Sequence, residues 1–311
     1  MRERATIRFL PDGHRLHLND GPIDLILDAD GHQAEIRRAY LAAAARFVTI
    51  LEELCAELPL LRRRATHSAE LPVSPIARRM ADAVTPYCNQ CFITPMAAVA
   101  GAVADAVLAT MTEVACLRRA YVNNGGDIAL HLAASENYTI GMVERPERPS
   151  LFGTLKVSSG SPVRGVATSG WRGRSFSLGI ADAVTVLAET AAQADAAATI
   201  IANAVDLPSH PAVLRIPARE IAPDSDLLNL PVTRGVGPLS AAEIVRALKA
   251  GQSVADELRS RNLIHAAALC LQGRVRITRN CRDGIRSLTC HSELSTEPAF
   301  RSTIEEHLCQ K

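Results

Sequence analysis

Short runs of apolar and polar residues at the start of the chain predict a small meander of strands. Residues 6–10, 15–18 and 23–27 have this character, and Pro-Asp-Gly and Asn-Asp-Gly turns separate them. From Gln33 to about Arg62 the apolar residues recur at helical spacing instead. This spacing predicts one long amphipathic helix, whose apolar face carries Ile36, Tyr40, Ala43, Phe47, Ile50 and Leu51. A short helix is expected over 76–83.

A second long helix is expected to begin at Thr94 and Pro95. Threonine is a good N-cap residue, and proline suits the first helical position. The helix body, residues 97–117, is rich in alanine and contains Gly101, so it can pack tightly against a sheet. Asp105 lies on this apolar helix and must find a partner. Two interpretations stay open: the carboxylate pairs with a neighbouring backbone or arginine, or it faces a ligand.

Beyond residue 119 the pattern changes to strands, which Gly, Asn, Pro and Ser residues separate. The expected strands cover residues 120–122, 128–132, 138–143, 151–157, 163–166 and 183–188. Thr190 and Gln193 then form a capping-box signature that starts another helix. Because the strands come first and the helix afterwards, the order favours an α+β fold over a doubly wound parallel sheet.

The last third of the chain is less regular. Residues 208–230 are rich in Pro and Asp and predict irregular structure. Two helices are expected over 240–250 and 253–271, followed by a strand over 274–278. Residues 279–311 are expected to form a loosely attached tail.

Composition and charge exclude some classes of function for this chain. The 311 residues are 48% hydrophobic and 22% charged, which is typical of a folded protein. A net charge of +1 gives no overall attraction to nucleic acid or to an anionic membrane. The apolar segment from Ile93 to Met111 contains Asp105 and is built mostly from Ala and Val, so we expect a buried helix rather than a membrane span. No secretory signal is visible, which predicts a cytoplasmic protein.

Two smaller motifs have an ordinary interpretation and a functional one. Cys88 and Cys91 form a lone C-x-x-C, which without a second ligand pair is expected to be structural rather than redox-active or zinc-binding. The basic run over residues 62–64 is expected to be a solvated helix end, and contact with a phosphate or substrate is the alternative.

Three glycine- or alanine-rich segments could carry chemistry. The first, from Asn123 to Asp127, holds Asn124, Gly125 and Gly126 between two expected strands. Its two glycines permit a positive φ and close backbone approach. The segment is either a hairpin turn or a loop whose backbone N–H groups hold an anion or a ring carbonyl.

The second segment comprises Ala167, Thr168, Ser169 and Gly170. It leads into Trp171, Arg172 and Arg174. Arginine pairs with phosphate and tryptophan can stack, so the segment could cradle a charged, planar ligand. A surface turn anchored by the tryptophan is the alternative.

The third segment places Asp195 and Thr199 four residues apart, on one face of the expected helix. A carboxylate and a hydroxyl together offer two hard oxygens, which suit Mg²⁺ or Ca²⁺. The ordinary alternatives are an aspartate that interacts favourably with the helix dipole and a threonine that bonds its own backbone.

The order of these segments resembles the ApbE superfamily, flavin transferases that use Mg²⁺ and FAD to attach FMN to a protein threonine. Those proteins have an Ala/Gly helix ending in Asp, a Gly-Gly-Asp turn, an Ala-Thr-Ser-Gly turn and an Ala-Asp-Ala-x-Ala-Thr helix. The corresponding segments here are residues 100–105, 125–127, 167–170 and 194–199. The resemblance implies that Mg²⁺ is held by the backbone carbonyl of Ala167 and by the side chains of Asp195 and Thr199.

The chain is still more similar to an ApbE-like branch found in methanogens, methylotrophs and other prokaryotes, over roughly residues 1–277. The sequence segments 94–101, 173–177 and 180–186 are typical of this branch. The resemblance implies an α+β, T-fold-like architecture in which largely antiparallel sheets pack with long helices. It also implies one domain over 1–277, which could consist of two pseudo-symmetric halves, followed by a tail over 278–311.

One departure concerns the transfer step. The flavin transferases carry a His-x-x-Asp-Pro-x-Thr-Gly segment after the Ala-Thr-Ser-Gly turn. Here that region, residues 176–183, keeps only Asp182 as a stand-in for the acid. Asp182 and Asp127 are therefore the candidate catalytic residues. The candidate cofactor-binding residues are Asn124, Gly125, Gly126, Asp127, Thr168, Ser169, Gly170, Arg172 and Arg174.

The expected function is that of an Mg²⁺-dependent, ApbE-like protein that binds FAD, FMN or a pterin. As an enzyme it would cleave or transfer at a phosphate linkage. Two alternatives remain: a protein for the biosynthesis of a one-carbon carrier such as tetrahydromethanopterin, and a non-catalytic cofactor-binding protein. The expected partner is a small-molecule cofactor or nucleotide, with no nucleic acid and no membrane, and a homo-oligomer is left open.

Overall fold

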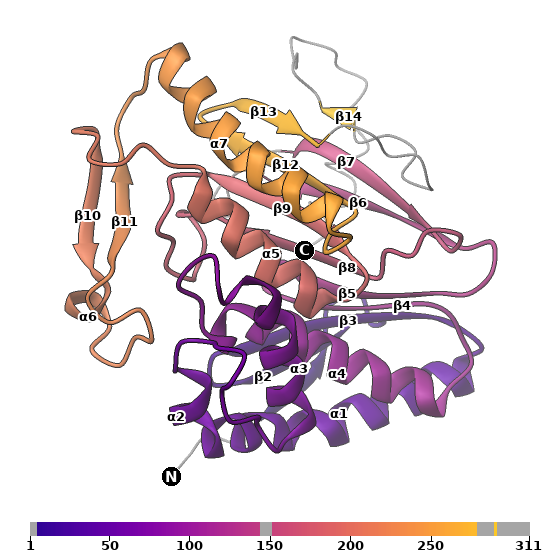
Figure 1. The fold of residues 1–311 in the computed structure, drawn as a ribbon. Coiled ribbons are helices and arrows are strands. Elements are labelled where there is room, and N and C mark those ends of the chain that lie inside the picture. Colours follow the sequence, from indigo (N-terminus) through magenta and orange to yellow (C-terminus); the bar gives the residue numbers. More distant parts are fainter. Residues whose placement is uncertain (1–4, 144–150, 279–288, 291–311) are drawn as a thin grey trace.

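The fold is built around a nine-stranded antiparallel sheet (Figure 1). The computed structural model describes residues 5–143, 151–278 and 289–290. From one edge to the other the strands are β1 (Thr6–Phe9), β2 (Leu16–Asp20), β3 (Ile23–Gly31), β4 (Leu117–Asn124), β5 (Asp127–Leu132), β8 (Gly165–Ser169), β9 (Ala183–Ala188), β12 (Ala266–Leu271) and β13 (Arg274–Ile277). Strands from the two ends of the chain thus share one sheet, and β5 and β8 meet at its centre.

Helices cover one face of this sheet (Figure 1). The long ones are α1 (Gln33–Ala56), α4 (Val99–Val114), α5 (Ala191–Ala204) and α7 (Ala241–Ser260). Shorter elements connect α1 to α4, namely α2 (Leu58–Leu61), α3 (Pro75–Val84), η1 (Thr85–Tyr87) and η2 (Pro95–Ala98). Alanine dominates the contact surface of α5, where nine residues are buried and seven of them are alanine. Small side chains let this helix lie close to the sheet and to α4.

A smaller sheet covers part of the opposite face. It consists of β6 (Asn137–Val143), β7 (Leu151–Ser158) and β14 (Thr289–Cys290). Leu155 and Val157 of β7 pack with Val166, Leu187 and Ala268 of the large sheet to form a second apolar cluster. The central strands are therefore buried on both faces, which explains why β12 is a continuous apolar run and why β9 is apolar except for Thr185.

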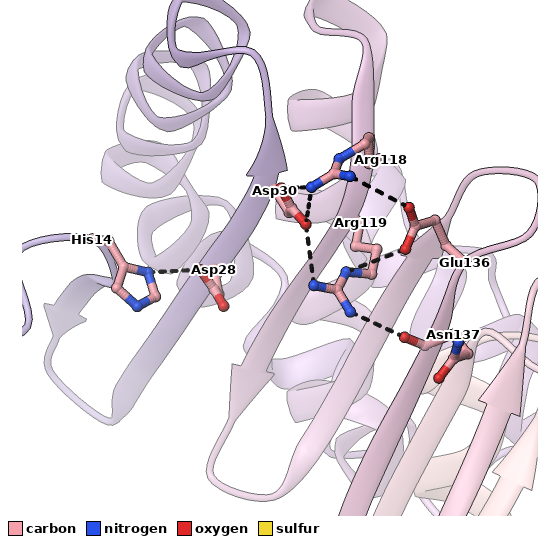
Figure 2. Close-up of polar contacts among 7 residues, drawn as sticks. All are labelled: His14, Asp28, Asp30, Arg118, Arg119, Glu136 and Asn137. Atoms are coloured by element: carbon pink, nitrogen blue, oxygen red, sulfur yellow. Dashed lines mark hydrogen bonds and ion pairs between the residues drawn. The ribbon is translucent and has the colours of Figure 1, made fainter. Parts of the chain in front are cut away.

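The neighbouring part of that face, over β3 and β4, carries charges instead of an apolar layer. Figure 2 shows Arg118 and Arg119 directed at the Asp30 carboxylate, with N···O distances of 2.6 and 3.1 Å. Arg119 also donates to the carbonyl oxygen of Asn137, and Glu136 lies 3.6 Å from its Nε. His14 contacts Asp28 nearby at 3.1 Å. These pairs join β3, β4 and the start of β6, next to the contact between the Tyr121 and Tyr138 rings.

Most of the expected elements are confirmed. The N-terminal meander and the strands between residues 117 and 188 lie where the sequence predicts them, with ends that differ by a few residues. The long helix after the meander is also present, but it ends at Ala56 rather than near Arg62, and Leu58–Leu61 form the separate helix α2. All strand pairs among the described residues are antiparallel. The expected α+β architecture of largely antiparallel sheets packed with long helices is thus confirmed.

The prediction of two helices over 240–271 is wrong. A single helix, α7, runs through Gly251, and residues 266–271 form the buried strand β12. Gly251 does not break the helix but permits close packing, because a Cβ there would lie 2.3 Å from Cγ2 of Val205. A short apolar run cannot be assigned to helix or strand by periodicity alone, and here sheet pairing decides it.

The prediction of irregular structure over 208–230 is correct for residues 208–212 and 222–230 but wrong in between. Residues 213–221 form the strand β10 (Val213–Pro217) and the short helix α6 (Ala218–Ile221). β10 pairs with β11 (Pro231–Val236) in a hairpin that projects from the body of the protein (Figure 1). The pairing partner lies fourteen or more residues along the chain, so local turn signals gave no indication of it.

Thr94 occupies the N-cap position but does not cap the helix as expected. Its hydroxyl donates instead to the Asp226 carboxylate, in the segment between β10 and β11. Among the described residues, one helical segment, Pro95–Val114, is long and apolar enough to cross a membrane by length and composition. It packs between α1 and α5, with Gly101 to Ala104 buried, as expected for a core helix. The expected tail lies outside the described residues except at Thr289–Cys290.

Substitution of Gly165 tests how closely β8 packs against the start of α5. A Cβ at this position would lie 2.0 Å from the Thr190 carbonyl oxygen, a backbone atom that cannot rotate away. We expect Gly165→Ala to lower the free energy of unfolding by roughly 1–3 kcal/mol through overpacking, measured by urea denaturation. Gly160→Ala is the control, because nothing lies within 4 Å of its Cβ. Equal effects of the two changes would contradict this account of the β8–α5 contact.

Candidate functional site

Helices α4 and α5 meet at their N-terminal turns, where each supplies an aspartate to the other. Asp105 of α4 accepts hydrogen bonds from the backbone N–H groups of Ala191 and Ala192, at 3.1 and 3.0 Å. Asp195 of α5 accepts one from the N–H group of Gly101, at 3.0 Å. Of the two interpretations of Asp105, the structure therefore supports the carboxylate that binds a neighbouring backbone.

Gly101 makes this arrangement possible. A Cβ at residue 101 would lie 2.2 Å from the Ala191 carbonyl oxygen, so only glycine allows the two backbones to come so close. Nearby, the buried Asn124 side chain donates to the carbonyl oxygen of Ala100 at 3.2 Å. The start of α4 is thereby tied both to α5 and to the end of β4.

The Gly-Gly turn joins β4 to β5 as a two-residue hairpin. Asn124 pairs with Asp127 across it, and Gly125 and Gly126 have φ values of +65° and +111°. A positive φ at both positions matches a type I′ turn, so the hairpin interpretation of this segment is correct. The turn also has an arginine beside it, because a Cβ on Gly125 would lie 2.0 Å from Nη2 of Arg174.

Asp127 brings this hairpin next to the Ala-Thr-Ser-Gly segment. Ile128 pairs with Val166, and one residue further the Asp127 carboxylate accepts a hydrogen bond from the N–H group of Thr168 at 3.2 Å. The Thr168 hydroxyl bonds that of Thr185 at 2.9 Å. Two of the three candidate segments are therefore neighbours at the centre of the large sheet.

Asp127 and Asp195 influence each other's ionisation. Burial raises the pKa of Asp127 to about 7, although the Thr168 N–H group and the positive charge of Arg174 act in the opposite direction. Burial also raises the pKa of Asp195 well above its usual value, and the negative charge of Asp127 raises it further. Hydrogen bonds place the third segment near the first, because Asp195 accepts the N–H group of Gly101 and Asn124 donates to the carbonyl oxygen of the adjacent Ala100. Neither carboxylate forms an ion pair within the described residues.

Thr199 follows Asp195 by one turn of α5 and is half-buried. Its hydroxyl has no hydrogen-bond partner within the described part of the chain, so it does not bond its own backbone. Among the described residues, no three His, Cys, Asp or Glu side chains form a group that could hold a metal ion. A metal site here therefore needs backbone or hydroxyl oxygens in addition to carboxylates, and the expected donors Ala167 and Thr199 are of that kind.

Asp182 lies in a different environment. Its side chain is 1% exposed and accepts hydrogen bonds from Nε1 of Trp171 at 3.1 Å, Nε of Arg172 at 2.7 Å and the N–H group of Gln272 at 2.6 Å. The Arg172 guanidinium lies over the Trp171 ring, 4.4 Å from its centroid. Gly170 packs against the Asp182 backbone. The structure thus fixes the segment after Ser169 through this carboxylate.

The remaining motifs lie apart from this cluster. Cys88 is buried and Cys91 half-buried, and both are free thiols. Burial raises the pKa of the Cys91 thiol, which lowers its reactivity. Arg62 forms an ion pair with Asp224 at 2.7 Å. Sequence reasoning missed the contact of Arg174 with Gly125 and the Gly101 donor to Asp195, since neither follows from local spacing.

Together, the fold and the site define an ApbE-like protein, with antiparallel sheets, long helices and acidic residues where β5, β8 and α5 meet. The sequence model of the family described as AbpE bacteria matches residues 7–277, and the chain belongs to this family.

Among curated proteins the chain is similar to UPF0280 proteins from methanogens. It is 36% identical to the one from Methanopyrus kandleri over 173 residues, covering 55% of this chain and 61% of the relative. It is 37% identical to the one from Methanothrix thermoacetophila over 161 residues, covering 50% and 64%. The match thus spans less than two thirds of the length of these relatives.

Solved structures give weaker likenesses. The ApbE protein from Thermotoga maritima aligns over 88% of this chain and 96% of its own, with 14% identity and a TM-score of 0.41. A mutant form of the flavin transferase ApbE from Vibrio cholerae aligns over 85% and 96%, with 13% identity and a TM-score of 0.36.

Because of Asp127 and Asp195, we expect the metal-free protein to lose stability as pH rises. Their pKa values are raised in the folded state, so between about pH 4 and 7 the folded chain binds more protons than the unfolded chain. The free energy of unfolding therefore falls through that window. Urea denaturation in EDTA at several pH values measures the slope.

Asp127→Asn should make this slope shallower, because it removes one of the two carboxylates. Glu113→Gln, at an exposed position on α4, is the matched control and should leave the slope unchanged. A slope that is the same in wild type and Asp127→Asn would show that Asp127 is not protonated in this range.

Proposed function

We propose that the chain binds Mg²⁺ and a flavin- or pterin-type cofactor where β5, β8 and α5 meet, and that it cleaves or transfers at a phosphate linkage of that cofactor. The observation that carries the proposal is that burial raises the pKa of both the Asp127 and the Asp195 carboxyl group, that the two interact electrostatically, and that neither forms an ion pair within the described residues. Burying two like charges is costly, and a divalent cation offsets that cost. Family membership supports the flavin part, because the ApbE proteins that the chain resembles use Mg²⁺ and FAD.

The donor set fits a hard cation. Carboxylate, hydroxyl and backbone carbonyl oxygens are the ligands that Mg²⁺ prefers. Asp195, Thr199 and the carbonyl oxygen of Ala167 would hold the ion, and Asp127 adds negative charge beside them. Asp127, Asp195 and Thr199 are half-buried as whole residues, which leaves part of their surface open to an entering ion. When bound, the ion would polarise a phosphoryl oxygen as a Lewis acid.

The other residues take roles that follow from their contacts. Arg174, next to the Gly125 turn, would neutralise phosphate charge, and the backbone of residues 124–126 and 168–170 would line the cofactor pocket. Asp127, whose carboxylate accepts the N–H group of Thr168, would orient the cofactor or accept and return a proton at its phosphate linkage. Asp182 would act by holding Trp171 and Arg172 in place, because three donors surround its carboxylate.

Cation binding should stabilise the wild-type protein at pH 8. Ligation stabilises the folded state by about 2.7 kcal/mol at a cation concentration one hundred times Kd, so Tm should rise with the logarithm of Mg²⁺ concentration. At pH 5.5 the rise should be smaller, because protons compete for the carboxylates. Asp195→Asn keeps an acceptor for the Gly101 N–H group and should lose the rise. KCl at equal ionic strength is the salt control, and an undiminished rise in the variant would remove Asp195 from the site.

Incubation with FAD and Mg²⁺ should release AMP, measured by chromatography. Asp195→Asn should reduce the rate at least about 100-fold, as expected when a group that places a catalytic metal is lost. Absence of release with the wild-type protein would reject cleavage of FAD. The absorption spectrum of the purified protein then separates the alternatives, since a bound flavin absorbs in the visible and a reduced pterin does not. A pterin spectrum without AMP release would favour the one-carbon carrier alternative.

A further inference from the structure

A hollow of about 370 Å³ lies between α3 and the first turn of α5. Arg78, Arg79 and Asp82 line it from α3, and Thr190 and Gln193 line it from α5. Its volume is in the range of small-molecule sites in proteins. None of the residues proposed to hold the metal or the cofactor lines it.

Hydrogen bonds hold Arg78 in place, and the terminal N–H groups of both guanidinium groups have no hydrogen-bond acceptor within the described residues except the Pro72 carbonyl oxygen. Arg78 donates from Nε and Nη2 to the carbonyl oxygen of Pro72, at 3.3 and 3.2 Å, which accounts for two of its five N–H donors. The Arg79 Nε is buried and has no hydrogen-bond partner within the described residues. Arginine is always charged, so these donors favour an anionic acceptor.

The acidic residues near the hollow satisfy these charges only in part. Asp105 forms a long ion pair with Nη1 of Arg79, at 3.9 Å, and its oxygens also accept the N–H groups of Ala191 and Ala192. Asp82 follows Arg78 by one helical turn, yet the two form no ion pair within the described chain. The N-terminus of α5 cannot bind the anion itself, because its first three N–H groups donate to Asp105 and to the Thr190 hydroxyl.

We propose that this hollow binds the phosphate group of a small phosphorylated molecule through the guanidinium groups of Arg78 and Arg79. Guanidinium groups match phosphate oxygens in geometry and charge. Thr190 and Gln193 supply further polar contacts on the opposite wall. Asp195 lies three residues beyond Ala192, about 4.5 Å along the helix axis, but the anion site needs no metal.

A second hollow, of about 330 Å³, lies on the other side of Asp82 and is lined by Arg63, Arg64 and His67. The side chains of Arg63 and Arg64 are exposed and form no ion pair or hydrogen bond within the described residues. Because no hydrogen bond or ion pair from the described part of the chain holds their guanidinium groups, more side-chain entropy would be lost on binding there. We therefore expect weaker anion binding in this second hollow, and a substitution there serves as the control.

The test is titration calorimetry of the full chain with inorganic phosphate and with pyrophosphate, in EDTA. We expect saturable binding that weakens about tenfold or more in Arg79→Gln and in Arg78→Gln, the loss typical of a hydrogen bond to a charged group. Arg79→Lys keeps the charge but not the planar fork, so its affinity should fall between those of wild type and Arg79→Gln. Arg63→Gln, in the other hollow, and Asp195→Asn, in the proposed metal site, should change Kd by less than about twofold.

Absence of saturable binding by the wild-type protein would overturn the proposal. If Arg63→Gln loses binding and Arg78→Gln keeps it, the anion binds in the other hollow and the proposal is wrong. If Asp195→Asn loses binding, the anion binds at the metal site and the proposal is also wrong. Circular dichroism confirms folding of each variant. If Arg79→Gln fails to fold, Arg78→Gln decides, because that side chain is exposed. Failure of Mg²⁺ binding would leave this result unaffected, so the two proposals fail separately.

Discussion

The structure depends on the close contact between the first turns of α4 and α5. Each helix supplies one aspartate that accepts the free N–H groups of the other, Asp105 toward α5 and Asp195 toward α4. Such groups at a helix start have no partner within their own helix, so reciprocal capping satisfies both ends at once. The contact requires a glycine at position 101, since any side chain would meet the Ala191 carbonyl group. It brings the central helices to the middle of the sheet, where β5 and β8 meet.

This contact concentrates negative charge in the interior. Asp105, Asp127 and Asp195 are close enough that Asp127 and Asp105 both raise the pKa of Asp195. Only Arg79 and Arg174 bring positive charge near them within the described chain, and each is partly or fully exposed. Capping hydrogen bonds stabilise the Asp105 carboxylate. The backbone N–H groups that bind Asp127 and Asp195 offset only a small part of the desolvation cost of two buried negative charges. A fold that keeps such a pair has a physical reason to bind a cation there.

The proposed metal site and the proposed anion site between α3 and α5 both use residues of α5, but they rely on different chemistry. The metal proposal relies on hard oxygens at the second and third turns of the helix, whereas the anion proposal relies on guanidinium groups that α3 presents to its first turn. Asp105 lies between the two proposed sites, because its carboxylate binds the first N–H groups of α5 and also approaches Arg79. A single helix can therefore contribute to a cation site and to an anion site without the two charges neutralising each other.

The sequence by itself determined most of the elements and the family. The meander, the helices α1, α4 and α5 and the Gly-Gly hairpin follow from periodicity and turn chemistry, which act between residues close in the chain. Tertiary structure alone decided that residues 266–271 form a strand, that Gly251 is a packing point, that Thr94 bonds Asp226 and that Asp105 caps α5. It also assembled Arg78 and Arg79 with α5, although nothing in the local pattern marked them. These outcomes depend on partners dozens of residues away, and local sequence does not encode which distant surface a side chain will meet.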